Sequence, residues 1–414
     1  MREKNKVRQG VMNFFGVMFL LFFCSLSNSA TEKTLLLYHD ADWSNYIGAS
    51  ESIWRGVNVA LQEVDYTVQG YNIKMVKKNH SGNVLRSLNN TKAFVQDEDA
   101  LAVISGMHSQ PLIKNRSFIN ENKVLTLVPW AAGGPVTRYP SAENWVFRLS
   151  VDDTKAGKVL VDYALDQKGC KAPHMLLPDN PWGDSNLLSM GEALTSRGRD
   201  AASVTRFSWN LKRYSAIKKM SDIVSSGADC ILLVANVIEG VEIAKAIASL
   251  ELRSPLPIVS HWGITGGDFY NEVDARERDK LDLSFIQTCF SFMSSPLSAK
   301  GQEVLDKAKV QFPDIRSPSD VKSPVGFIHG YDLTRVLLSA LNDVTLSGNA
   351  ESHRDDLRIS LENMSVSVDG LIKTYSKPYG QYSDTQVDAH EALSSPDYCM
   401  ASYDANGDIV LNPK

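Results

Sequence analysis

Three of the seven tryptophans in the chain come shortly after apolar runs that the pattern predicts as buried strands. Trp130 follows "LTLV", Trp182 follows "HMLLP" and Trp262 follows "PIVS". An indole offers a large apolar face and one hydrogen-bond donor, so three indoles brought together would form aromatic walls around a ligand. The alternative for each indole is packing between a helix and a sheet.

The loop around Trp130 reads "PWAAGGP" and contains no acid, histidine, cysteine or serine. Its glycine pair allows the backbone to approach a ligand closely. We therefore expect this loop, which includes Ala131 and Ala132, to offer peptide N–H groups to a carboxylate or a carbonyl. Such a loop can bind a molecule but has no group with which to react.

The sequence lacks the short motifs that usually mark catalysis or nucleotide binding: GxSxG, GxGxxG, the P-loop lysine and HExxH. The eight histidines are scattered without metal-ligand spacing. These absences favour a binding protein over an enzyme. No cofactor and no metal site is predicted.

Four cysteines follow the first thirty residues, and no two of them form a CxxC motif: Cys170, Cys230, Cys289 and Cys399. In an oxidising compartment they allow up to two disulfides, with three connectivities. Buried free thiols are the alternative, and the sequence leaves the choice open.

The first thirty residues have the pattern of an export signal: a cationic start, a long apolar run and then the small residues "SNSA". We expect residues 1–30 to be a signal peptide that is removed as the chain leaves the cytoplasm. An uncleaved membrane anchor and a lipid-modified Cys24 are the alternatives. The full chain has a formal net charge of −5, and loss of the cationic leader makes it more acidic, so nucleic acid is a poor candidate partner.

The elements that must position the tryptophans follow a regular order. From residue 35 to about residue 263, short apolar strands alternate with amphipathic helices, which predicts parallel sheets covered on both faces. Two such units meet near "NWVFRLSVDD". From about Leu283 a strand, three helices and a hairpin around Asn406-Gly407 follow. Ligands bind outside the carboxyl ends of the strands in such sheets, where the tryptophans are expected.

Several stretches, in this order and spacing, resemble those of one family: "RGVNVALQEVD", "ALAVISGMHS", "NKVLTLVPWAAGGPVT", "NWVFRLSVDDTKAG", "LLPDNPWGDS" and "HGYDLTRVLLSAL". The chain resembles, from Leu35 to Val410, the type 1 periplasmic solute-binding proteins of ABC transporters, the group of the leucine/isoleucine/valine-binding proteins. The resemblance implies an α/β fold of two Rossmann-like lobes joined by a three-stranded hinge. The first lobe would comprise residues 31–148 plus 286–364, and the second residues 149–285 plus 365–414.

The resemblance also implies ligand contacts. Ser109 matches a serine that binds the ligand carboxylate, and Trp182 an aromatic residue that covers the ligand. The remaining matches are pocket or loop positions of the family: Tyr46, Trp130, Ala131, Ala132, Asn236, Trp262 and Tyr331.

Two departures from the family pattern bear on the ligand. Ala132 stands where a threonine hydroxyl is usual, and Trp262 stands where an acid usually pairs with an α-ammonium. A buried ammonium without a carboxylate is costly, so the sequence favours an aromatic acid, an amide or a quaternary ammonium compound over an ordinary amino acid. If Glu239 or Asp184 reached the ligand, that acid would pair with an α-ammonium and restore an ordinary amino acid as the expected ligand.

The function that the resemblance implies is capture of a small molecule in the periplasm, by a monomer, for delivery to a membrane permease. A sensory receptor that presents the ligand to a histidine kinase or chemoreceptor is the alternative. An enzyme using Asp184, His261 or His329 as acid or base is the third reading.

Overall fold

The computed structural model describes residues 33–200 and 202–413. Its first sheet has the strand order β2-β3-β1-β4-β5-β6 and is parallel except for the β2–β3 pair. Its strands are β1 (Thr34–Ala41), β2 (Thr67–Val68), β3 (Tyr71–Asn79), β4 (Ala100–Ser105), β5 (Thr126–Val128) and β6 (Val146–Arg148). The wholly buried strand β4, "ALAVIS", has the continuous apolar character of a parallel strand covered on both faces.

The second sheet has the order β15-β14-β11-β10-β9-β7-β8. Its parallel strands are β7 (Pro173–Pro178), β8 (Ser203–Phe207), β9 (Cys230–Leu233), β10 (Pro257–Ser260) and β11 (Asp282–Thr288). Two antiparallel strands, β14 (Tyr398–Tyr403) and β15 (Ile409–Leu411), extend its edge and form the hairpin that Asn406-Gly407 predicts. Gly407 supplies the positive φ, 86°, that this turn requires.

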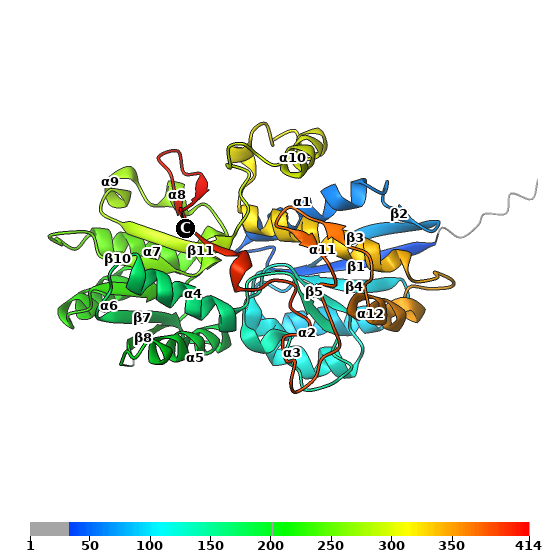
Figure 1. The fold of residues 1–414 in the computed structure, drawn as a ribbon, viewed down its shortest axis with the longest axis horizontal. Helices are drawn as coiled ribbons and strands as arrows, with labels where there is room; N and C mark the ends of the chain where they lie inside the picture. The colour runs from blue at the N-terminus through cyan, green and yellow to red at the C-terminus, as the bar shows by residue number, and fades with distance from the viewer. Residues whose placement is uncertain (1–32, 201, 414) are drawn as a thin grey trace, which may run out of the picture. The chain divides into compact units, whose positions relative to one another are not determined.

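Each sheet has helices on both faces (Figure 1). Against the first sheet, α1 (Ile47–Gln62) packs with α11 (Pro324–Asn342), and α2 (Val84–Val95) packs with α3 (Ser109–Glu121). Against the second sheet, α4 (Asp153–Asp166) packs with α5 (Pro181–Ser196), and α6 (Arg213–Ser225) packs with α7 (Val237–Ala248). The reversal of strand order within each sheet requires this placement, since crossovers between parallel strands are right-handed.

Local chemistry sets several helix ends. The Asn83 side chain accepts the N–H of Arg86 and so caps α2. Asn180 accepts the N–H groups of Trp182 and Gly183, and Pro181 occupies the first position of α5. The Asn180 cap fixes the first turn of α5, which carries Trp182.

The chain passes between the sheets three times. It leaves the first sheet after β6 and returns after β11 to α10 (Ala299–Gln311) and α11, then continues through α12 (Arg354–Glu362), β12 (Val368–Asp369) and β13 (Thr374–Tyr375). It enters the second sheet again at β14. The predicted fold class, two Rossmann-like lobes joined by three connections, is confirmed. The residue boundaries given to the lobes stay a prediction.

The cysteines form two disulfides, Cys170–Cys230 and Cys289–Cys399. The sequence left both pairing and free thiols open, and the structure selects one of the three connectivities. The predicted signal peptide lies outside the described residues. Within the described part of the chain, no helix has both the length and the apolar character needed to cross a membrane.

Candidate functional site

The three tryptophans from the strand ends lie together where the two lobes meet. Trp130 follows β5 of the first lobe, and Trp262 begins a 3-10 turn (Trp262–Thr265) after β10 of the second. Their ring centroids are 6.2 Å apart in an edge-to-face arrangement. The ring of His261 lies between the indoles of Trp182 and Trp262, with centroid distances of 5.2 Å and 6.0 Å respectively. We call Trp130, Trp182, His261 and Trp262, together with Asp153, the interlobe cluster.

The interlobe cluster is closed to solvent. The exposed fractions are 1% for Trp130, 8% for Trp182 and 1% for Trp262. Because the residues come from both lobes, a molecule can reach them only when the lobes move apart.

Asp153 is the acid of this cluster, and sequence reasoning missed it. It is the first residue of α4 and is fully buried. Its Oδ1 accepts the Nε1–H of Trp182 at 3.3 Å. His261 Nε2 lies 3.0 Å from the same oxygen, outside hydrogen-bonding geometry. The available signal was the "DD" pair after a strand end, but acids in the first turn of a helix are usually explained by the helix dipole.

The two acids that the sequence offered instead are engaged elsewhere. Asp184 is exposed and pairs with Arg206, with 2.8 Å between Oδ1 and Nη2. Glu239 accepts the N–H of Asn210 at 2.9 Å and the Tyr46 hydroxyl at 3.4 Å. Burial raises the pKa of Glu239. Among the described residues, neither acid forms a hydrogen bond with the three tryptophans.

Two amides of the glycine loop, those of Gly133 and Gly134, are not free. The N–H of Gly133 donates to Ser109 Oγ, and the N–H of Gly134 donates to Ser185 Oγ of the opposite lobe, each at 2.9 Å. Ser109 therefore holds the loop in place. Close packing requires glycine at both positions, because a side chain at either one would collide with neighbouring residues that include the two serines.

The carbonyl groups of the loop are held by a buried arginine. Arg148 Nη1 donates to the carbonyl oxygens of Ala132 and Gly133 at 3.0 and 2.8 Å. The N–H of Asp153 also donates to Ala132, at 2.9 Å. The loop that carries Trp130 is thus fixed to the start of α4, which carries Asp153.

Asn236 and Trp182 approach the turn of Trp262 from the same side. A β-carbon added to Gly263 would lie 2.7 Å from Asn236 Oδ1 and 2.8 Å from Trp182 Cη2. Only glycine leaves room for both side chains. The structure therefore brings Asn236 to the edge of the interlobe cluster.

Tyr46 lies in a neighbouring part of the same interface. Its ring is 4.8 Å from that of His108, and its hydroxyl reaches Glu239 across the lobes. His108 in turn lies 3.4 Å from Asp42. Tyr46 and the tryptophans thus belong to one interlobe surface.

Tyr331 is the predicted residue that the structure does not bring to the interlobe cluster. It is buried on α11, and its hydroxyl donates to Glu63 at 2.7 Å. Burial and this carboxylate raise the pKa of Tyr331. The α11 residue beside the tryptophans is instead His329, whose ring is 5.1 Å from that of Trp262.

His329 is fully buried. Nδ1 lies 2.9 Å from the Pro129 carbonyl and Nε2 lies 3.1 Å from Thr288 Oγ1. Burial lowers the pKa of His329 to about 4.

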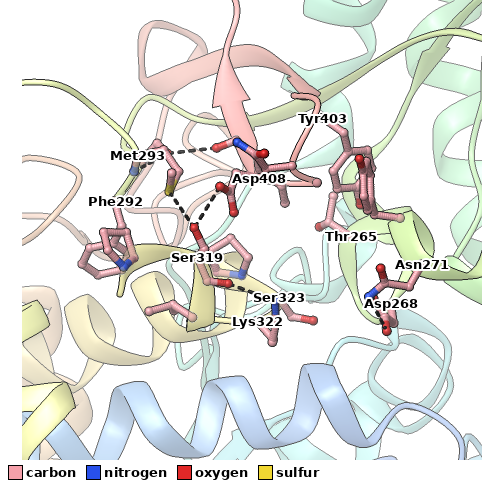
Figure 2. Close-up of a pocket in the computed structure, with 18 of the residues that line it drawn as sticks. Thr265, Asp268, Asn271, Phe292, Met293, Ser319, Lys322, Ser323, Tyr403 and Asp408 are labelled. Carbon is pink, nitrogen blue, oxygen red and sulfur yellow. Dashed lines mark hydrogen bonds between the residues drawn. The ribbon is translucent and has the colours of Figure 1, made fainter. Parts of the chain in front are cut away.

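An open pocket of about 170 Å³ lies elsewhere, between the β14–β15 hairpin, the residues after Trp262 and the segment 318–324 (Figure 2). Some of its polar side chains pair with one another, since Ser319 Oγ donates to Asp408 at 2.8 Å and Asn271 donates to Asp268 at 2.8 Å, whereas the buried Ser323 Oγ has no partner among the described residues. None of the predicted site residues lines it. We therefore place the candidate site at the interlobe cluster, where the predicted tryptophans from both lobes come together.

Among the described residues, the group whose spacing could hold a metal ion is Cys170, Asp229 and Cys230. Both sulfurs of this group are joined in a disulfide. They therefore offer no thiolate to a metal.

A family profile described as periplasmic binding protein matches residues 44–390. No curated protein sequence matches the chain. A solved structure of a possible leucine/isoleucine/valine-binding protein from Rhodopirellula baltica aligns with a TM-score of 0.75 at 14% identity, covering 92% of this chain and 97% of that one.

Two further solved structures contain ligands. The R. palustris solute-binding protein in complex with benzoate aligns with a TM-score of 0.70 at 16% identity, over 91% of this chain and 95% of that one. The branched-chain amino acid transporter substrate-binding protein of Streptococcus pneumoniae, in complex with isoleucine, aligns with a TM-score of 0.70 at 17% identity, over 92% and 100%. These likenesses show the shared fold.

Proposed function

Because the chain belongs to the periplasmic binding protein family, we propose that it captures a small molecule between its lobes outside the cytoplasm and delivers it to an ABC transporter permease. The observation that carries this proposal is the interlobe cluster, which both lobes build at the carboxyl ends of their strands. A ligand that contacts both lobes stabilises the closed arrangement over the open one.

The proposed ligand is an amino-acid-like, aromatic, amide or quaternary ammonium compound. Indole rings bind such compounds through their faces, and a few polar groups fix the orientation. The residues proposed to contact it are Tyr46, Ser109, Trp130, Ala131, Ala132, Trp182, Asn236 and Trp262. In this proposal the ligand is bound and released without chemical change.

The test is a thermal-unfolding screen of the protein against amino acids, aromatic acids, amides and quaternary ammonium compounds. A ligand present at 100 times its Kd adds about 2.7 kcal/mol to the stability of the folded state. Trp262→Phe, which keeps a ring but loses the indole, should weaken that ligand at least tenfold. Trp54→Phe is the matched control, because Trp54 stacks on His39, 6.2 Å away, rather than on the cluster. Equal loss in both variants would contradict the placement of the site.

The transport step is tested in cells. Deletion of the gene should abolish uptake of the radiolabelled ligand, and a plasmid copy should restore it. Uptake that continues at the original rate in the deleted strain would refute delivery to a permease.

A further inference from the structure

Asp153 holds a polar atom that the folded protein leaves without a partner. The side chain is fully buried, and Oδ2 has no hydrogen-bond partner among the described residues. Buried polar atoms are nearly always bonded, and a buried charge without compensation is expensive. This oxygen therefore needs an explanation that the fold alone does not give.

The nearby cations form their ion pairs with other acids, and Asp153 contributes less than Asp152 and Glu391 to raising the pKa of Arg148. Arg148 Nη2 lies 2.7 Å from Asp152 and 2.9 Å from Glu391, and Lys155 also binds Glu391 at 2.9 Å. The one described residue within ion-pair distance of Asp153 is His261. His261 Nδ1 accepts the N–H of Trp262 at 3.0 Å, so the ring carries its hydrogen on Nε2.

The surroundings of Asp153 are aromatic. Trp182 donates to its other oxygen, His261 lies beside it, and Trp262 and Trp130 continue the group of rings. Indole faces attract organic cations, and more strongly when water is excluded. A buried carboxylate within such rings has the chemistry of a site for a positively charged ligand.

A second group without a partner adds one requirement. Trp130 Nε1 is buried and donates to no described residue. It calls for a ligand oxygen as acceptor. The amides of Gly133 and Gly134 already serve Ser109 and Ser185, so they are not the donors for that oxygen.

We propose that the interlobe cluster selects a small organic ammonium ion that also carries an oxygen acceptor. Asp153 provides the counter-charge, the indoles contact the apolar substituents on the nitrogen, and Trp130 donates to the oxygen. This inference rests on the proposed function and names the class of its ligand.

Isothermal titration calorimetry with defined probes tests the role of charge in the unaltered protein. Choline carries both the ammonium and an oxygen, tetramethylammonium carries only the cation, and the neutral carbon isostere of choline has the same shape without charge. Choline should bind at least about 100-fold more tightly than its isostere, with tetramethylammonium between them. Equal binding of choline and the isostere would overturn the inference.

A pair of variants tests Asp153 itself. Asp153→Asn should weaken choline at least about 30-fold and leave the weak binding of the neutral isostere unchanged. Glu362→Gln is the matched control, because Glu362 is a buried acid whose bonds to Arg358 and His390 lie apart from the cluster. Unchanged choline binding by a folded Asp153→Asn protein would show that the carboxylate is not the counter-charge.

The same titrations separate this inference from the proposed function. If benzoate, titrated in the same way, binds and neither choline nor tetramethylammonium does, the protein is a solute-binding protein but the inference is wrong. If none of these probes binds, the inference is wrong, and the thermal-unfolding screen decides the proposed function separately. Because the comparison of choline with its isostere uses the unaltered chain, misfolding of a variant leaves the result decisive.

Discussion

Asp152 and Asp153 are neighbours in sequence, and both are fully buried, yet they face opposite kinds of surroundings. Asp152 binds Arg148 at 2.7 Å and Arg138 at 2.9 Å. Asp153 has aromatic rings around it and one oxygen without a partner. Asp152 is held by two arginines within the fold, although burial still raises its pKa to about 6. Asp153 is instead left for a ligand.

The network around Asp152 joins segments that lie far apart in the chain. Glu391, in the last crossover, binds Arg148, Arg138 and Lys155. Burial alone would raise the pKa of Glu391, but these three cations outweigh burial and lower the pKa below its ordinary value. A buried charge therefore indicates a binding site only where it lacks partners of opposite charge.

The largest effect is expected at Arg148. Arg148→Met leaves Asp152 and Glu391 buried with fewer cations and releases the carbonyls of the glycine loop. We expect a loss of about 3–5 kcal/mol in the free energy of unfolding, measured by urea titration. Arg197→Met is the control, because the ion pairs of Arg197 with Asp162 and Asp166 are exposed and should contribute little. A comparable loss in both variants would contradict the structural role of the network.

The second-largest effect on stability is expected at Asp152, and Asp153 provides the direct comparison. Asp152→Asn removes the charge that Arg148 and Arg138 bind and should cost about 2–3 kcal/mol of stability. Asp153→Asn removes a charge without a cationic partner, so the stability of the unliganded protein should stay the same or rise. Chemical unfolding of both variants in parallel decides, and equal losses would mean that Asp153 is as well compensated as its neighbour.

A smaller effect concerns His329, which lies beside Trp262 and is uncharged. Its pKa of about 4 in the folded protein is below the ordinary value near 6.5 in the unfolded chain. Between these values the unfolded chain binds a proton that the folded chain does not, so this contribution to stability falls as the pH falls. Relative to His329→Gln, the unaltered protein should lose about 2 kcal/mol between pH 7 and pH 5. A pH-independent difference between the two proteins would show that the pKa of His329 is the same in the folded and the unfolded chain.

The smallest effect is expected from Ser185→Ala, which removes the acceptor that binds the N–H of Gly134 across the lobes. We expect a loss of about 1 kcal/mol in stability and up to fivefold weaker ligand binding, because the closed arrangement loses one contact. Ser196→Ala is the control, since Ser196 bonds within its own helix region to Ala193. Calorimetry of both variants measures the difference.

The tryptophans were predictable because strand ends are visible in the sequence as breaks in apolar runs. Trp130, Trp182 and Trp262 each follow such a break, and the order of parallel strands then places them at one edge. The fold class was predictable for the same reason, since alternation of the two periodicities is a local property.

Asp153 was not predictable, because what distinguishes it from Asp152 is the absence of a partner, which depends on packing of the whole chain. The hydrogen bonds of Gly133 and Gly134 were missed for a related reason, since they depend on how α3 and α5 approach the loop. Tyr331 illustrates a third limit: α11 is buried on nearly all sides, so its periodicity does not tell which face meets the other lobe.

The hydrogen bond from Gly134 to Ser185 has a consequence for selectivity. This bond joins the two halves through protein atoms alone, so it lowers the free energy of the shut form even when no guest is bound. A guest then needs to supply only the remaining difference, which raises apparent affinity for every candidate alike. Discrimination must therefore come from contacts that only the correct guest makes. A partner protein that recognised the shut form alone would also bind protein molecules that carry no guest.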